Sequence, residues 1–390
     1  MKRLIALFAC GILLASIPTI SVGAKDIDPT VTLNVYNWGE YIDPDVNDMF
    51  TEETGIKINY KNFTDNESMY AVLDSGAATY DIIVPSDYMV GKLINEGKLA
   101  KLNFENIPNM SFINPSLRNP VYDPANEYSV PYTWGTVGIF YNTKYVDEAD
   151  LAQGWDLLWD EKYSGRIFNF DNPRDAFGIA LLKTGHSLNT HDLSHWDEAY
   201  EALREQKKVL HQYVMDQIYD KMINEEGWIA PYYAGDGIIM MDEEEGNPAI
   251  DFFVPQNGTN LFVDALCIPA NSQHKREAEE YINFLCRTDI ALLNAEYIGY
   301  STPHVEAQSQ LDPEIAEDEN FYPPKEVLDK TEMFLTLPND VGAHMDTLWM
   351  KLKLAAPGWS VFTVLVGVIA VVCLVMVATR RMRQVFKRKR

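Results

Sequence analysis

Cysteine is scarce in this chain, which has four cysteines in 390 residues. Cys10 and Cys373 lie in apolar runs near the two ends, so only Cys267 and Cys286 belong to the long central part. Two cysteines exclude the dense disulfide framework that staples small secreted domains. Cys267 falls in an apolar run and Cys286 in a helical pattern, so we expect buried free thiols, with a single bridge left open.

Familiar catalytic motifs are also absent from the sequence. It contains no G-x-S-x-G elbow, P-loop, G-x-G-x-x-G fingerprint, H-E-x-x-H or C-x-x-C pair. A glycosidase would need a pair of carboxylates, but with 57 acidic residues such pairs carry little information. The sequence therefore favours a binding protein over an enzyme and indicates no cofactor.

Two short patterns leave metal binding open. His191 and His195 have helical spacing, but no third ligand accompanies them, and histidines at a helix start are usually solvated. The adjacent Tyr232 and Tyr233 suit ferric iron as phenolate ligands, and they also suit the wall of a pocket for an organic ligand. A ferric-iron carrier is thus an alternative interpretation.

Basic residues are few in the central part of the chain. Two of the 32 Lys and Arg residues lie in residues 1–24 and seven lie after Ala355, so residues 25–355 hold 23 bases against all 57 acids, a formal net charge of −34. A surface this acidic argues against nucleic acid as a partner and attracts small cations at low salt.

The two ends of the chain predict its location. Residues 1–24 have a basic start, an apolar stretch and small residues at the end, as in a secretory signal. Residues 359–378 carry no charge and are long enough to cross a ~30 Å hydrocarbon core, so we expect a transmembrane helix over 357–379. Seven basic residues in the tail 380–390 favour a cytoplasmic C-terminus, with the central part on the extracytoplasmic face of the cell membrane.

The central part reads as alternating strands and helices and is too long for one average domain. Strand-like runs fall at 33–36, 56–60, 81–84, 138–141, 166–170, 251–254 and 262–268. Helical patterns fall at 43–54, 66–75, 88–96, 192–209, 214–225, 275–287 and 340–354. This alternation predicts an α/β fold with two lobes.

One strand-to-helix turn combines aromatic rings with a carboxylate. Trp38, Glu40 and Tyr41 follow the apolar run 33–36 and precede a helix start at residue 43. Ligands of open α/β sheets collect at such turns. A carboxylate between aromatic faces suits an organic cation, because the acid pairs with an ammonium group while the rings attract its charge and cover its methylenes.

Seven stretches, in order along the chain, carry a resemblance to a known family. They are 37–41 (NWGEY), 53–57 (ETGIK), 80–88 (YDIIVPSDY), 128–135 (YSVPYTWG), 264–271 (DALCIPAN), 297–303 (YIGYSTP) and 339–343 (NDVGA). Together they resemble the spermidine/putrescine-binding proteins of ABC importers over residues 30–350. The resemblance implies a two-lobed fold of the type II periplasmic-binding-protein kind, in which strands cross between the lobes and the polyamine binds between them.

The same resemblance implies the order of the parts along the chain. Residues 30–136 would begin lobe 1, 137–264 would begin lobe 2, 265–310 would complete lobe 1, and 311–354 would pack mainly on lobe 2. The first crossing would follow Trp134, and the second would precede Asp264.

The resemblance also implies the ligand-binding residues. They are rings and hydroxyl groups at Trp38, Tyr41, Ser86, Tyr88, Tyr233, Phe262 and Tyr300, and carboxylates at Glu40, Asp171, Asp175 and Asp264. The rings would cover methylenes, and the carboxylates would receive ammonium groups. Helix capping is the competing role for Ser86, Asp171 and Asp175, which lie near helix starts. Tyr233 and Phe262 stand where the family often has tryptophan, which weakens cation-π attraction.

The sequence thus predicts an extracytoplasmic polyamine-binding protein. Its C-terminal helix would anchor it to the membrane beside the permease subunits of an ABC importer, to which it would deliver the ligand. A membrane-tethered polyamine sensor with the same cleft is the alternative. The choice between putrescine and spermidine stays open.

Overall fold

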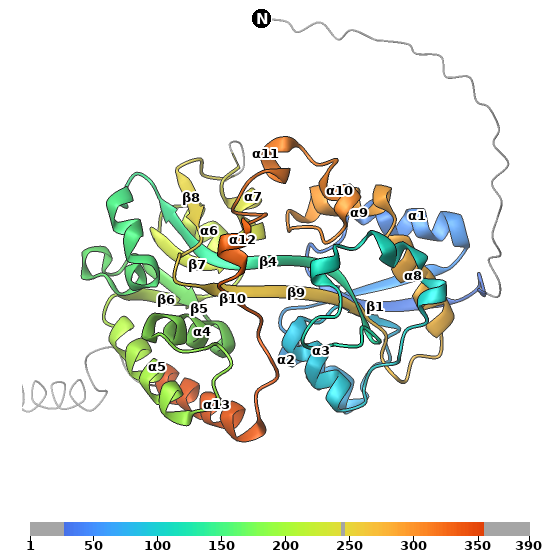
Figure 1. Ribbon diagram of the computed structural model, residues 1–390, viewed down its shortest axis with the longest axis horizontal. Helices are drawn as coiled ribbons and strands as arrows, with labels where there is room; N and C mark the ends of the chain where they lie inside the picture. Colours follow the sequence, from blue (N-terminus) through green and yellow to red (C-terminus); the bar gives the residue numbers. More distant parts are fainter. Residues whose placement is uncertain (1–26, 243–245, 355–390) are drawn as a thin grey trace, which may run out of the picture.

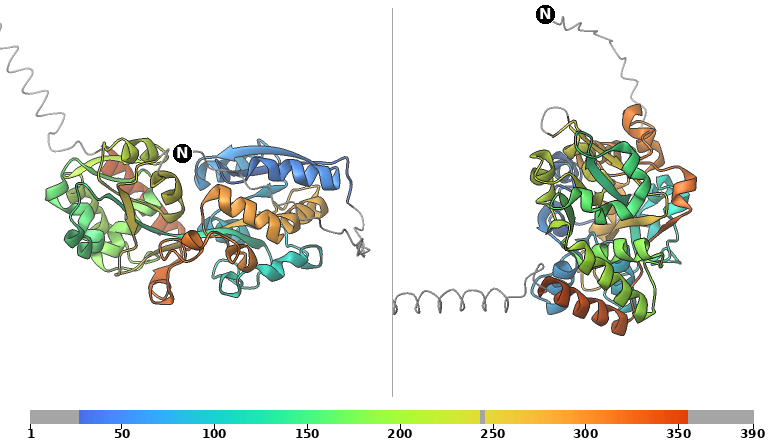
Figure 2. Two further views of the ribbon diagram at one scale, coloured as in Figure 1. Left: turned by 90° about the horizontal axis from the view of Figure 1, so that it is seen from above. Right: turned by 90° about the vertical axis from the view of Figure 1, so that its left-hand side faces the viewer.

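The computed structural model describes residues 27–242 and 246–354, which form an α/β protein of two lobes (Figures 1 and 2). The predicted signal (1–24), transmembrane helix (357–379) and basic tail (380–390) lie outside the described residues. Within the two described ranges, no helix combines the length and the apolar character needed to cross a bilayer.

Lobe 1 is built on three parallel strands in the order β2-β1-β3. The strands are β1 (Thr32–Trp38), β2 (Lys57–Phe63) and β3 (Ile82–Ile83). One face of this sheet is covered by α1 (Pro44–Thr54), α8 (Lys275–Leu285) and α9 (Thr288–Ile298), and the other by α2 (Asn66–Ser75) and α3 (Asp87–Asn95). Short helices α10 (Val305–Gln308), α11 (Pro313–Ala316) and α12 (Lys325–Leu328) follow α9 in the chain.

The boundaries of α1 show how local sequence sets these elements. The side chain of Asp43 accepts a hydrogen bond from the first turn, and Pro44 occupies a position where a missing N–H costs nothing. Gly55 ends the helix in the left-handed region at φ 81°, which glycine adopts without a steric penalty. The helix therefore starts and stops where the sequence predicts.

Lobe 2 repeats this plan with strands in the order β7-β5-β6. The strands are β5 (Ile167–Phe170), β6 (Leu210–Val214) and β7 (Ile229–Tyr233), all parallel, with β8 (Ile250–Phe253) paired to β4 beside them. The helices are α4 (Pro173–Thr184), α5 (Leu193–Gln206), α6 (Ile218–Ile223), α7 (Gly237–Met240) and α13 (Asn339–Leu354). The last helix, α13, packs on α4 and α5 at the outer edge of the lobe (Figure 1).

Two long antiparallel strands, β4 (Ser129–Asn142) and β9 (Thr259–Cys267), run through both lobes and join them (Figure 1). Every residue of both strands is buried, so neither shows the alternation of a half-exposed strand. The register shifts between Pro131 and Thr133, as expected where a proline removes a ladder hydrogen bond. These strands form the backbone of the connection between the lobes.

The hydrophobic cores divide along these strands. Val130 and Trp134 of β4 pack in lobe 1, whereas Val137 and Ile139 pack in lobe 2. β9 joins the core of lobe 1 from Leu261 onward. Residues 311–354 divide between the lobes, because the side chains of Tyr322, Leu328 and Met333 pack on lobe 1 and those of α13 on lobe 2. Cys267 and Cys286 are buried and unpaired.

Candidate functional site

A cavity of about 610 Å³ lies between the lobes, beside the crossing strands. It is lined from lobe 1 by the end of β1 and the start of α3, and from lobe 2 by the end of β7 and the start of α4. Ten predicted binding residues line it: Trp38, Glu40, Tyr41, Ser86, Tyr88, Asp175, Tyr233, Phe262, Asp264 and Tyr300. Asp171, the remaining predicted residue, does not line the cavity.

Five aromatic rings form a continuous row along the cavity. Centroids lie 6.5 Å apart for Trp38 and Tyr41, 5.3 Å for Tyr41 and Tyr300, 5.9 Å for Tyr300 and Phe262, and 5.3 Å for Phe262 and Tyr233. Each pair meets edge-on, an arrangement that aromatic quadrupoles favour. The row runs from the end of β1 to the end of β7, so an extended apolar chain can contact both lobes at once.

Asp264 on β9 is a buried carboxylate of lobe 1 in this cavity. It is 4% exposed and accepts hydrogen bonds from the hydroxyls of Tyr41 (2.7 Å) and Ser86 (2.6 Å). Burial raises the pKa of Asp264 to about 6, although these donors oppose the shift by stabilising the ionised form. It pairs with no Lys or Arg among the described residues, so its charge remains available to a ligand.

Ser86 and Tyr88 hold their places through side-chain hydrogen bonds. Ser86 stands at the N-cap position of α3 but does not cap the helix, because its hydroxyl donates to Asp264 and accepts from the Asn66 amide at 3.1 Å. The Tyr88 hydroxyl donates to Glu67 at 2.9 Å. The capping role predicted as an alternative for Ser86 is therefore not the one observed.

Asp171 and Asp175, both predicted as ligand-binding residues, have different surroundings at the start of α4. Asn172, not an acid, caps α4 by accepting from the amides of Arg174 and Asp175. This leaves the Asp175 carboxylate, 6% exposed, to accept from the Tyr233 hydroxyl at 3.0 Å, and burial raises the pKa of Asp175 to about 7. Asp171 lies one residue earlier, outside the cavity, where its carboxylate pairs with Lys353 at 2.5 Å. Asp171, predicted as a ligand-binding residue, is thus not among the residues that line the cavity, whereas Asn172 is.

Asp236 is another buried carboxylate in the cavity, and it is not among the predicted binding residues. It is 5% exposed and accepts hydrogen bonds from the hydroxyls of Tyr219 (2.6 Å) and Tyr300 (2.8 Å). Burial raises the pKa of Asp236 to about 7. The available signal was its position three residues after Tyr233, a predicted binding residue.

Glu40 and Trp38 occupy the rim of the cavity on the lobe 1 side. Glu40 adopts a left-handed conformation at φ 49°, uncommon for a residue with a side chain, and its exposed carboxylate accepts from the Tyr297 hydroxyl at 2.7 Å. The Trp38 indole donates to the Val84 carbonyl at 2.9 Å, which fixes the orientation of its ring. This rim offers an acid beside a rigid aromatic face.

The cavity is strongly acidic. Seven carboxylates line it: Glu40, Asp65, Asp87, Asp175, Asp216, Asp236 and Asp264. No Lys, Arg or His is among its described lining residues. Burying a carboxylate that pairs with no cation costs free energy, and a ligand with several ammonium groups can offset that cost.

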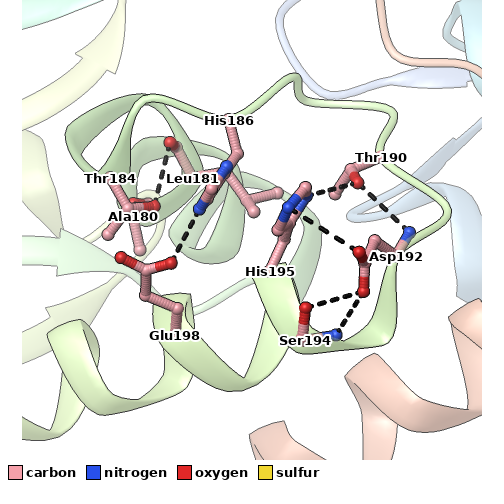
Figure 3. A network of polar contacts seen from close by, with 9 residues as sticks. All are labelled: Ala180, Leu181, Thr184, His186, Thr190, Asp192, Ser194, His195 and Glu198. Atoms are coloured by element: carbon pink, nitrogen blue, oxygen red, sulfur yellow. Dashed lines mark hydrogen bonds and ion pairs between the residues drawn. The ribbon is translucent and has the colours of Figure 1, made fainter.

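Of the two histidines considered for metal binding, His195 lies beside His186, which was not considered (Figure 3). The ring of His195 stacks on that of His186 with centroids 3.8 Å apart. The two imidazole rings have different hydrogen-bond partners. Nε2 of His186 lies 2.8 Å from the Glu198 carboxylate, and Nδ1 of His195 lies 2.8 Å from the Thr190 hydroxyl. Within the residues that the structure describes, no three His, Cys, Asp or Glu side chains are grouped to hold a metal ion.

The two adjacent tyrosines also have separate surroundings. The Tyr232 ring stacks on Phe170 with centroids 5.3 Å apart, while the Tyr233 hydroxyl donates to Asp175. Burial, and then nearby carboxylates, raise the pKa of both phenols well above the ordinary value. These surroundings disfavour the phenolate form that a ferric-iron site requires.

Comparison with known proteins agrees with this geometry. Residues 46–323 match the family described as bacterial extracellular solute-binding protein. The spermidine/putrescine-binding periplasmic protein of Escherichia coli is 36% identical, over 88% of this chain and 97% of that protein. This chain belongs to the bacterial extracellular solute-binding proteins.

Two solved structures have similar folds. One is the spermidine/putrescine substrate-binding protein PotD of Streptococcus pneumoniae, which is 36% identical, with a TM-score of 0.74 over 83% of this chain and 99% of that one. The other is the TpPotD lipoprotein of Treponema pallidum, 27% identical, with a TM-score of 0.74 over 82% and 99% of the two chains. The solute-binding fold thus extends over nearly the whole described part of the chain.

Proposed function

We propose that this protein binds a polyamine, such as putrescine or spermidine, outside the cytoplasm and delivers it unchanged to the permease of an ABC importer. The observation that carries the proposal is the cavity between the lobes, where buried carboxylates that form no ion pair with a described Lys or Arg side chain lie beside a row of aromatic rings. A polyamine has the complementary pattern, with ammonium groups separated by methylenes. The polyamine-binding relatives support the same ligand class.

Different lining residues would contact different parts of the ligand. The rings of Trp38, Tyr41, Tyr300, Phe262 and Tyr233 would cover the methylenes of an extended chain. The carboxylates of Glu40, Asp175, Asp236 and Asp264 would receive its ammonium groups. Asp264 and Asp236 approach from opposite lobes, so a ligand that pairs with both would favour the closed arrangement of the lobes.

The free energies of these contacts show that the rings and the carboxylates are both needed for tight binding. Burying the four methylenes of a butyl segment contributes about 3 kcal/mol, at ~0.8 kcal/mol each. Micromolar affinity requires about 8 kcal/mol. Charge-assisted hydrogen bonds of ~1.5 to 3 kcal/mol each would supply the difference, after desolvation and ordering costs.

The terminal segments would determine where in the cell the two lobes lie. The signal at 1–24 would direct export, and a membrane helix over 357–379 would hold the protein beside its permease with the tail 380–390 in the cytoplasm. In a lipoprotein, a covalent lipid provides the membrane anchor instead, and the Treponema relative is a lipoprotein. Hinge motion about β4 and β9 would then present the closed form to the permease.

The test compares two aspartates of the same chain by calorimetry with putrescine and spermidine. Asp264→Asn should weaken binding at least tenfold, because an amide cannot neutralise an ammonium group. Asp171→Asn, outside the cavity, should leave the affinity unchanged. Equal affinities for wild type and Asp264→Asn would refute the assigned site.

A further inference from the structure

We infer that the end of lobe 2 around the last turn of α13 rests on the headgroups of an anionic phospholipid surface. The inference rests on the part of the proposed function that assigns a membrane helix to 357–379. It is independent of which ligand the cavity binds. Three features of this end of the lobe support it: an exposed apolar stripe, a group of basic residues and a short tether.

The apolar stripe lies on the outward face of α13. Met350 is 58% exposed and Leu354 is 85% exposed, and they stand one turn apart, so they project from the same face. The opposite face of the helix is buried against α4 and α5. Large apolar side chains this exposed have no role in the core of the lobe and suit an interface with lipid.

The basic group surrounds this stripe. Lys351 and Lys353 lie in the last turn of α13, and Arg204, Lys207 and Lys208 lie at the end of α5. The two helix ends adjoin, because the Lys207 ammonium donates to the Leu352 carbonyl at 2.6 Å. Arg204, Lys208 and Lys353 pair with Glu201, Glu205 and Asp171, respectively. This end thus holds five of the 23 bases of residues 25–355, which together carry a formal charge of −34. The exposed Asp346 lies one turn before Met350 on the same helix.

Charge therefore orients the molecule. An anionic lipid surface repels the acidic remainder of the two lobes and attracts this end, and screening confines the effect to about 10 Å. Lysines close to such a surface gain from the negative headgroups, and the neighbouring apolar side chains gain by insertion among them.

The tether leaves little freedom for another orientation. Four residues, 355–358, separate Leu354 from the start of the apolar run at Trp359. Five extended steps of chain span at most about 18 Å. A lobe of roughly half the described chain has a radius of gyration of about 15 Å, hence a diameter near 40 Å. The tether is too short for the far side of lobe 2 to face the membrane.

One consequence concerns the motion of the lobes. Since α13 packs on α4 and α5, a membrane contact at its end fixes lobe 2. Lobe 1 is then the part that moves when the cavity closes.

The experiment uses the full chain in nanodiscs with a fluorescent label at Thr347→Cys, an exposed position on the stripe face of α13. Cys10 and Cys373 are replaced by alanine, while Cys267 and Cys286 are buried and can stay. A matched control carries the label at Val121→Cys, which is 66% exposed on lobe 1. Quenching is measured with headgroup spin-labelled lipid, in discs with and without phosphatidylglycerol.

We expect the label at 347 to be quenched at least twofold more than the label at 121, and most strongly with phosphatidylglycerol. Leu354→Glu with Lys351→Glu should halve that quenching, while thermal melting stays unchanged because both side chains are exposed. Equal quenching at 347 and 121, in a chain that the disc retains and that still binds putrescine, would overturn the surface contact alone. A chain that the disc fails to retain would refute the membrane helix and this surface together.

Discussion

At the scale of single residues, three of the buried carboxylates of the cavity share one kind of support. Asp175, Asp236 and Asp264 each accept from tyrosine hydroxyls rather than from a cation. Hydroxyl donors orient a carboxylate without neutralising it. The acids are thus preorganised, at a cost in burial that a cationic ligand would offset.

Asp236 offers the first prediction at this scale. Asp236→Asn should weaken polyamine binding tenfold or more, because one charge-assisted bond of ~1.5 to 3 kcal/mol is lost. The empty protein should become no less stable, since a buried charge is removed. Asp220→Asn, exposed on α6 in the same lobe, is the matched control and should change neither quantity. Calorimetry and thermal melting check both, and undiminished binding by Asp236→Asn would contradict the role given to this acid.

Gly235 supports Asp236 indirectly. A Cβ at this position would lie 2.4 Å from the ring of Tyr300, which donates to Asp236. Gly235→Ala should therefore displace Tyr300, weaken polyamine binding about tenfold and lower the melting temperature. At Gly342 in α13 an added Cβ meets no atom within 4 Å, so Gly342→Ala should leave binding intact and stabilise the helix slightly. Similar affinities for the two variants would show that the close approach of Gly235 is unimportant.

At the scale of elements, the sequence predicted those strands that have a clear boundary. β1, β2 and β9 were predicted within a few residues, because apolar runs there end in turn signals. Only 138–141 was predicted of β4 (Ser129–Asn142), since both faces are buried and Pro131 interrupts the first half. β7 was missed for a related reason, because Pro231 lies inside a central strand. Long-range pairing, which a local pattern cannot contain, overrides these local signals.

The site was predictable where a motif fixed the position of a side chain relative to a strand. Trp38, Tyr41 and Asp264 belong to such motifs. Asp171 lies outside the cavity because a shift of one residue at a helix start turns a side chain to another side, and the sequence does not reveal which residue caps the helix. Asp236 required the three-dimensional fold, since Tyr219 and Tyr300 come from distant segments.

The N-cap of α4 gives the prediction at this scale. Asn172→Ala should cost about 1 kcal/mol of unfolding free energy, because the amides of the first turn lose their acceptor. It should also weaken polyamine binding, because that turn carries Asp175. Asp192→Ala removes the cap of α5 and should cost similar stability without affecting binding. Denaturant unfolding and calorimetry separate the two effects, and normal binding by Asn172→Ala would exclude the coupling.

At the scale of the whole molecule, the cavity couples ligand affinity to pH. The pKa values of Asp175 and Asp236 are raised to about 7 and that of Asp264 to about 6, all chiefly by burial. Above these values the acids are ionised and attract ammonium groups, and below them they are neutral. Polyamine affinity should therefore rise at least tenfold from pH 5 to pH 8 in calorimetry. A flat profile would mean that these acids do not contact the ligand.

The stability of the empty protein should change in the opposite direction. The pKa of an aspartate in the unfolded chain is about 3.9, so between about pH 4 and pH 7 the folded state holds more protons on these three acids than the unfolded state does. Their contribution to the free energy of unfolding thus falls as the pH rises through this window. Melting with and without putrescine should show the largest ligand-induced shift at pH 8.

The most direct test of the central claim compares putrescine with 1,4-butanediol, its uncharged analogue of the same length, by calorimetry at pH 8. If the cavity between the lobes recognises both charge and chain, putrescine should bind with micromolar or tighter affinity and the diol at least a thousandfold more weakly. Comparable binding of the two, or no binding of any polyamine, would contradict the account.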